Sequence, residues 1–176
     1  MAQHTTYSNW ADDDAVSPAQ EVKALRTAAL VFGLVFLAVG IAGFIPGLTT
    51  DADELELSGH ESGAELLGVF QVSGLHNAVH ILFGLAGIVA SRRWMWSRVY
   101  LIASGIAYLG LLVYGLAVEH DSEANFVPIN DADNWLHLGL GIAMLGLGLA
   151  LRPRAHRVPD ALESRGDSAD RVTSRW

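Results

Sequence analysis

Four apolar blocks dominate the pattern of hydrophobic and polar positions along the chain. They cover residues 27–45, 66–90, 98–118 and 134–151, and none of them contains an interior Asp, Glu, Lys or Arg. A helix of about 20 apolar residues spans the roughly 30 Å hydrocarbon core of a bilayer. The pattern therefore predicts a domain over residues 27–151 with four transmembrane helices, one for each block.

Small and polar residues recur every three or four positions within these blocks. In the second block the stripe consists of Ser73, Asn77, His80, Gly84 and Gly87. This spacing averages about 3.5 residues, which is the period of the seam between helices in a left-handed bundle. Glycine stripes also allow two helix backbones to approach closely. We therefore expect an all-α integral membrane four-helix bundle with left-handed packing.

The second half of the chain repeats features of the first half. Corresponding residues of the second and fourth blocks form the pairs His80 and His137, Asn77 and Asn134, and Gly84 and Gly141. A Phe-x-Pro sequence also occurs in each half, at 44–46 and 126–128. We expect two parallel-repeat helical hairpins related by a pseudo-twofold axis along the membrane normal. This arrangement would make His80 and His137 face each other at similar depth.

The positive charges predict how the helices are oriented. All eleven Lys and Arg lie in the segments 1–26, 92–98 and 152–176, whereas the loops 46–65 and 119–133 have none and are acidic. Segments rich in Lys and Arg stay on the cytoplasmic side. The sequence therefore predicts a multi-pass protein of the cell (inner) membrane with both termini in the cytoplasm. The basic C-terminal tail is expected to be disordered.

Composition narrows the range of partners. The net charge is −8 and the chain has no cysteine. Nucleic-acid binding requires clustered basic residues facing phosphate, so we exclude it, and the absence of cysteine excludes thiolate metal sites and disulfides. The expected partner is the lipid bilayer, together with a second copy of the chain or another membrane protein where glycine stripes face outward.

Ser17 and Pro18 are residues of the types that are common at the start of a helix, so we expect a helix to begin there.

Ionisable side chains inside a membrane usually mark a function. The candidate polar cluster consists of His76, Asn77, His80, Asn134 and His137. In the simplest interpretation it is a clasp that holds the bundle together, with Asn77 bonded to His137 and Asn134 to His80. The protein would then be non-enzymatic, and no arrangement of nucleophile, base and orienting residue is found. We also expect Asp131 and Asp133 to cap the last helix.

Two other functions remain open. His76 and His80 are four residues apart, as in helical metal sites, and Asp133 and His137 repeat that spacing. These four side chains would suit zinc or iron, and haem could be held by His80 and His137 with Gly84 and Gly141 leaving room beside it. The third interpretation is a small transporter or a proton-conducting protein. The first expectation is that the protein binds no cofactor.

Several separated motifs resemble one family of bacterial membrane proteins. They are Gly43-Phe44-Ile45-Pro46-Gly47, the segment from Phe70 to His80, and the segment from Asn125 to His137. Together they resemble the family called domain of unknown function 4383, over roughly residues 26–150. The resemblance implies a four-span inner-membrane protein and implies no established activity.

Overall fold

The structure is a computed structural model that describes residues 16–59, 61–119, 122 and 124–153. Most of the described chain is helical, as the sequence predicts. The helices are α1 (Pro18–Ala42), α2 (Gly74–Ala90), α3 (Trp94–Ala117) and α4 (Asp131–Ala150). The predicted disordered tail lies almost entirely outside the described residues.

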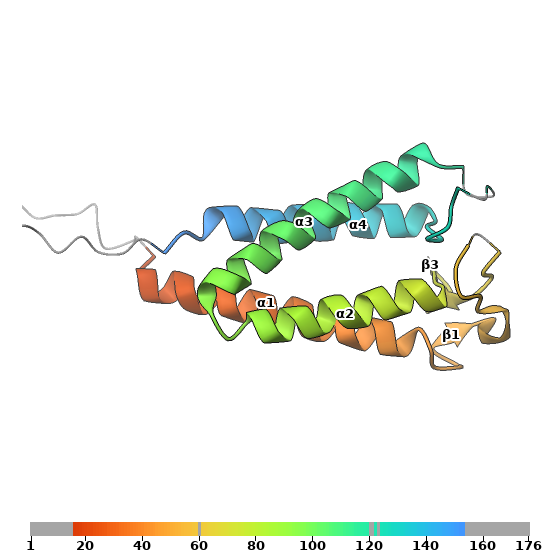
Figure 1. Ribbon diagram of the computed structural model, residues 1–176, viewed down its shortest axis with the longest axis horizontal. Coiled ribbons are helices and arrows are strands. Elements are labelled where there is room, and N and C mark those ends of the chain that lie inside the picture. Colours follow the sequence, from red (N-terminus) through yellow and green to blue (C-terminus); the bar gives the residue numbers. More distant parts are fainter. Residues whose placement is uncertain (1–15, 60, 120–121, 123, 154–176) are drawn as a thin grey trace, which may run out of the picture.

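The helices form two hairpins. α1 packs along α2, and α3 packs along α4, whereas contacts between the hairpins are sparser (Figure 1). The turn at 91–93, the start of α1 and the end of α4 lie at one end of the bundle, which we call the turn end. The loops 43–73 and 118–130 lie at the other end, which we call the loop end. α3 separates from α2 toward the loop end (Figure 1).

The start of α1 follows from its first residues. The Ser17 hydroxyl accepts a hydrogen bond from the Gln20 backbone N–H, and the Gln20 side chain accepts one from the Ser17 N–H. This reciprocal pair is a capping box, and Pro18 occupies the first turn, where its missing N–H is not needed. The expected helix start at Ser17 and Pro18 is confirmed. α1 therefore extends beyond its apolar part toward the N-terminus.

The second helix begins later than the apolar block suggests. We predicted a helix over 66–90, but α2 starts at Gly74, where Ser73 caps it by accepting from the His76 N–H at 3.2 Å. Residues 66–72 instead turn back on themselves, because Leu67 and Gly68 adopt positive φ angles of 57° and 66°. A short apolar segment does not distinguish helix from strand by periodicity.

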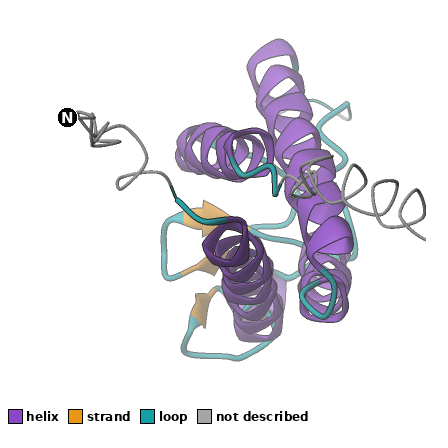
Figure 2. Cartoon of the chain, turned by 90° about the vertical axis from the view of Figure 1, so that its left-hand side faces the viewer, coloured by secondary structure: helices purple, strands orange, loops and turns teal. Residues whose placement is uncertain are grey.

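A small antiparallel sheet fills the loop between α1 and α2. Its strands are β1 (Thr49–Thr50), β2 (Glu65–Leu66) and β3 (Phe70–Gln71), in the order β1-β2-β3, and the short helix η1 (Ala52–Glu54) follows β1. Figure 2 views the bundle from the turn end and shows the strands beyond it, beside α1. Buried Ala64, Leu66 and Val72 pack against Val39 and Ala42 of α1. The sheet is thus fixed to the loop end.

Glycines bring the two helices of each hairpin into backbone contact. An added Cβ on Gly84 would lie 2.8 Å from the Gly33 carbonyl oxygen, and one on Gly141 would lie 3.3 Å from the Gly105 carbonyl oxygen. Of these positions, Gly84 and Gly141 match under the alignment that pairs His80 with His137. The predicted glycine stripes therefore pack α1 against α2 and α3 against α4 in the same way.

Two arginines make matching contacts at the turn end. The Arg26 Nε donates to the Ser91 carbonyl at 2.9 Å, and the Arg98 Nε donates to the Gly148 carbonyl at 2.9 Å. Each guanidinium reaches from the first helix of a hairpin to the last turn of the second, where carbonyls lack helical partners and positive charge is favoured.

Replacing either of these arginines by methionine should weaken its hairpin. Methionine keeps much of the apolar stem and removes the donor, so we expect Arg26→Met and Arg98→Met each to lower the free energy of unfolding by about 1–2 kcal/mol. The measurement is titration with sodium dodecyl sulfate in mixed micelles. Arg152→Met is the control, because the Arg152 Nε donates to the Leu149 carbonyl in the adjoining turn of its own helix. Equal effects at all three positions would contradict the assigned roles.

The Phe-x-Pro sequences do not occupy equivalent places. Residues 44–46 follow the C-cap of α1, whereas residues 126–128 lie just before the N-cap of α4. The two hairpins differ most in these loops, because the described residues of the second loop contain no counterpart of the sheet in the first. The sequence echo is therefore not part of the structural repeat.

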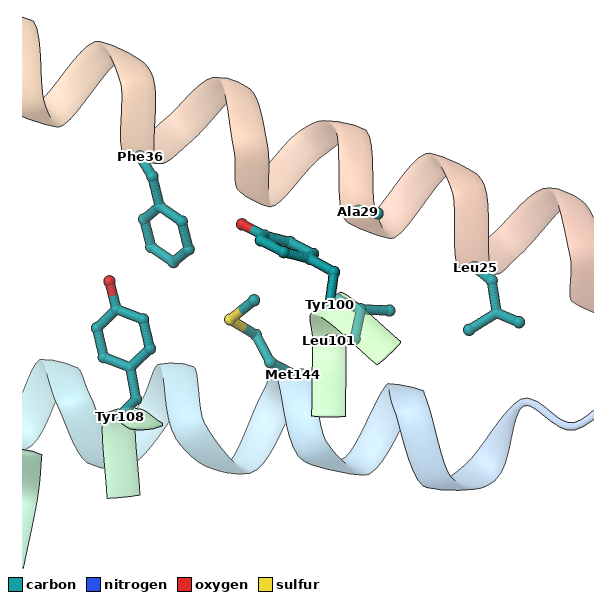
Figure 3. Packing of buried hydrophobic residues seen from close by; sticks show 7 residues of the cluster. All are labelled: Leu25, Ala29, Phe36, Tyr100, Leu101, Tyr108 and Met144. Carbon is teal, nitrogen blue, oxygen red and sulfur yellow. The ribbon is translucent and has the colours of Figure 1, made fainter. Parts of the chain in front are cut away.

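The core lies between the hairpins and is rich in aromatic rings. Phe36 of α1 and Tyr108 of α3 point toward one another, and Tyr100 lies between the helices near Met144 (Figure 3). The Phe36 and Tyr108 rings stack with centroids 5.3 Å apart. Such pairs stabilise beyond their buried area by about 0.5–1.5 kcal/mol. The two hairpins are thus joined by ring packing at mid-length.

Two of the described helices can cross a membrane by length and composition. These are α1 and α3, and α2 is a shorter apolar helix. Large apolar side chains face outward on all four helices, including Val31 (51% exposed), Leu82 (64%), Val113 (66%) and Ile142 (60%). An apolar exterior around the helices is unusual for a protein surrounded by water.

Candidate functional site

A cavity of about 470 Å³ lies between α2 and α3 at the loop end. Its walls are mostly apolar, with three histidines and one tyrosine as the polar exceptions. The lining residues are Leu75, His76, Val79, His80, Phe83, Ala107, Tyr108, Gly110, Leu111, Phe126, Val127 and His137. None of them is Asp, Glu, Lys or Arg. A mostly apolar cavity with a few polar groups is typical of small-molecule sites.

The fold explains why the cavity lies here. α2 and α3 are joined at the turn end and separate toward the loop end (Figure 1). The space between them is bounded at the loop end by Phe126 and Val127, which precede α4. The second Phe-x-Pro sequence thus contributes two of its residues to the wall.

His76 and His80 lie one above the other on the first two turns of α2. Their rings stack with centroids 4.7 Å apart and an angle of 18° between planes. His76 is buried, and a backbone hydrogen-bond acceptor from Pro128 lies beside its ring. In the described part of the chain, the Nδ1 atoms of both rings have no hydrogen-bond partner. A buried polar atom without a partner costs about 1–3 kcal/mol.

His137 reaches the same cavity from α4. His137 is 2% exposed, and the centroid of its ring lies 5.3 Å from the centroid of the Tyr108 ring. Among the described residues, its Nδ1 atom also has no hydrogen-bond partner. Phe36 contacts both His80, at 5.9 Å between ring centroids, and Tyr108. His80 and His137 therefore line one cavity, and the rings of Phe36 and Tyr108 form a chain of contacts between them.

The two asparagines lie apart from the histidines. The Asn77 side chain packs on Gly43 of α1, and the Asn134 side chain packs on Gly115 of α3. Both amides are buried without a hydrogen-bond partner in the described residues. The predicted clasp, in which each asparagine bonds to a histidine of the other hairpin, is therefore wrong. Each asparagine faces the glycine stripe of its own hairpin.

Asp133 belongs to the cap of α4 and does not line the cavity. The N-cap is Asn130, whose side chain accepts from the Asp133 N–H at 3.0 Å, while the Asp133 carboxylate accepts from the Asn130 N–H at 3.1 Å. The cap predicted at Asp131 is thus one residue too late, although Asp131 lies in the first turn. Asn130 and Ser73 occupy matching positions before α4 and α2.

The cap of α4 also connects the two hairpins. The Asp133 carboxylate accepts from the Gln71 N–H at 3.2 Å, and the Asn130 amide donates to the Val69 carbonyl at 2.8 Å. β3 is therefore bonded to the start of α4. The sequence analysis missed Asn130, although Asn-x-x-Asp is close to the capping-box pattern and would have indicated it.

The predicted metal and haem sites are not assembled in the described part of the chain. No group of three or more His, Asp or Glu side chains there could hold a metal ion. Stacked imidazole planes do not direct two nitrogens at one point, and Asp133 is occupied in the cap. Gly84 and Gly141 do not leave room for a macrocycle, because they face Leu37 of α1 and Leu109 of α3.

Comparison with known proteins identifies one match. A family model, described as a domain of unknown function (DUF4383), matches residues 26–150. No curated protein and no solved structure gives a significant match. The matched region begins in α1 and ends with α4, so it contains every residue that lines the cavity.

Proposed function

The chain belongs to the family of domain of unknown function 4383, and we propose that it is a four-span protein of the bacterial inner membrane. The apolar outward faces of all four helices support this proposal, because hydrocarbon is the surrounding in which such faces are stable. α2 has 17 residues, which is at the lower end of the length range of membrane-spanning helices. The matching contacts of the two hairpins support a bundle built from parallel repeats.

The proposed orientation places the turn end in the cytoplasm. Lys23, Arg26, Arg92, Arg93 and Arg98 lie near this end, whereas the loop end carries acidic residues. Positive charge stays on the cytoplasmic side of bacterial membranes. The histidine cavity then lies in the outer half of the bilayer.

The proposed function is binding of a lipophilic molecule with a small, uncharged polar head group. The observation that carries this proposal is the cavity of about 470 Å³, whose walls combine apolar side chains with three imidazoles. A charged head group would be left without a countercharge there, and burying an unpaired charge is far more costly than burying a hydroxyl or carbonyl.

The histidines supply the polar part of the site. His76 and His137 are almost fully buried, and the Nδ1 atoms of both rings are unbonded in the described chain. A hydroxyl or carbonyl of the ligand would pair with one imidazole nitrogen and with the Tyr108 hydroxyl. Each such bond contributes about 0.5–1.5 kcal/mol.

The ligand would enter from the surrounding lipid. Leu75 and Val79 of α2 and Phe126 of the loop line the cavity and are also 38%, 41% and 55% exposed. The cavity is thus bordered by residues that also face outward between α2 and α3, and no passage through the bundle is needed. This access favours a molecule that dissolves in the bilayer.

A photoreactive, alkyne-tagged long-chain alcohol tests this function in detergent-purified protein. We expect saturable labelling at α2 and α3 residues of the cavity. Replacing both His76 and His137 by phenylalanine keeps the ring volume and removes the nitrogens, so affinity should fall about tenfold, the equivalent of one or two lost hydrogen bonds. Ala107→Trp should block labelling by filling the cavity.

The controls separate a specific site from a generally apolar surface. His76→Gln retains hydrogen-bonding atoms and should bind more tightly than His76→Phe. An alkane probe of the same length should label the cavity weakly. The proposal would be overturned by equal labelling with the alkane, or by unchanged alcohol binding in the double phenylalanine variant.

A further inference from the structure

A second hollow lies between α2 and α3 at the turn end. Its volume is about 630 Å³, and one side is apolar while the other is basic. The lining residues are Leu85, Ala86, Val89, Ala90, Arg92, Arg93, Trp96, Val99 and Tyr100. This hollow shares no residue with the histidine cavity, so variants of its own lining test it separately.

The basic side is built by the turn between the helices. Arg92, Arg93 and Trp96 also line an adjoining hollow of about 340 Å³, which Arg26 of α1 borders as well. The bond from the Arg26 Nε to the Ser91 carbonyl holds that guanidinium beside the turn. None of the residues lining either hollow is acidic. Guanidinium groups bind phosphate oxygens in pairs of hydrogen bonds, so the chemistry favours a phosphate.

The apolar side continues toward the middle of the bundle. Ala86 and Tyr100 also line a third hollow, together with Leu82 and Phe83. Outward-facing Val89 and Leu82 border this groove. The groove therefore runs along α2 and α3 from the two arginines toward mid-length, which is the path of an acyl chain in one leaflet.

We infer that an anionic phospholipid binds at the turn end, with its phosphate on Arg92 and Arg93 and an acyl chain in the groove past Ala86. The juxtaposition of a basic hollow and an apolar groove carries the inference, because neither a soluble anion nor an alkyl chain alone would use both. Basic pockets between transmembrane helices on the cytoplasmic side bind such head groups. The inference rests on the proposed membrane location and orientation, and is independent of the proposed ligand in the histidine cavity.

The test is native mass spectrometry of the full chain in dodecylmaltoside micelles with phosphatidylglycerol or phosphatidylcholine. We expect the wild type to retain phosphatidylglycerol at least tenfold more tightly than phosphatidylcholine. Arg92→Gln/Arg93→Gln should abolish this preference. Lys23→Gln/Arg152→Gln removes the same charge at residues that line neither hollow, and it should leave the preference unchanged. Ala86→Trp should weaken phosphatidylglycerol binding at least tenfold by filling the groove.

Three outcomes would overturn the inference. Equal retention of phosphatidylglycerol and phosphatidylcholine would show that Arg92 and Arg93 do not select an anionic head group. Full affinity in Ala86→Trp would remove the acyl groove. Displacement of phosphatidylglycerol by millimolar glycerol 3-phosphate would indicate a soluble anion site. Thermal unfolding of each variant identifies loss of fold, and membrane fractionation tests the location separately, so failure of the proposed membrane location is distinguishable from failure of this site.

Discussion

Gly33→Ala and Gly84→Ala are expected to lower the free energy of unfolding by about 2–3 kcal/mol, the upper part of the range for overpacking. An added Cβ at Gly33 would lie 2.7 Å from the Ile88 nitrogen and 2.9 Å from the Gly84 carbonyl oxygen, and one at Gly84 would lie 2.5 Å from the Leu37 nitrogen. Backbone atoms cannot rotate away as a side chain can. The helices of the first hairpin must therefore separate, which weakens packing along their whole length.

The chain provides matched controls for this effect. An added Cβ at Gly139 or Gly146 of α4 has no neighbour within 4 Å. Alanine is favoured over glycine in a helix interior by about 1 kcal/mol, so Gly139→Ala and Gly146→Ala should be neutral or stabilising. Unfolding by sodium dodecyl sulfate in mixed micelles gives both sets of values. Destabilisation of equal size in both sets would show that the glycines of the first hairpin are not close contacts.

The second hairpin provides a graded comparison. At Gly141 the nearest atoms to an added Cβ belong to the Leu109 side chain, at 2.8 Å. A leucine side chain can move, whereas the backbone that faces Gly84 cannot. Gly141→Ala is thus expected to be better tolerated than Gly84→Ala, whereas Gly105 faces backbone, with an added Cβ 2.6 Å from the Leu145 nitrogen.

The pairing of the helices could be predicted from the sequence because small residues occur where two helix backbones approach closely. Gly33, Gly84 and Gly141 recur on stripes, and each of these glycines faces the partner helix of its own hairpin. Stripe patterns do not identify which neighbour a residue meets, however. Asn77 was assigned to the other hairpin for this reason, although it packs on Gly43.

The cavity and the sheet could not be predicted in the same way. The cavity depends on how far α3 separates from α2, which follows from packing across the whole bundle and not from a local pattern. The sheet arises from a short apolar segment, 66–72, whose composition suits a helix equally well. The histidines were found because ionisable groups stand out in an apolar block, whereas the apolar wall residues Val79 and Ala107 do not.

Asp133→Ala is expected to produce a second large loss of stability, of about 2–4 kcal/mol, because two buried or partly buried N–H groups lose their carboxyl acceptor. The carboxylate is 2% exposed and accepts from the Asn130 and Gln71 backbone N–H groups. One bond closes the cap of α4, and the other holds β3 against it. The substitution therefore weakens the start of α4 and the connection between the hairpins together.

Asp131→Ala is the matched control for this prediction. Asp131 lies in the same first turn and is exposed, so its replacement removes the same charge at the cost of a few tenths of a kcal/mol of helix-dipole interaction. Hydrogen exchange adds a second measurement: the Gln71 and Val72 amides should exchange faster in Asp133→Ala than in Asp131→Ala. If the two variants have the same free energy of unfolding and their β3 amides exchange at the same rate, the Asp133 carboxylate does not connect the hairpins. Loss of β3 protection with little change in α4 would instead show that the connection, more than the cap, is the main role of Asp133.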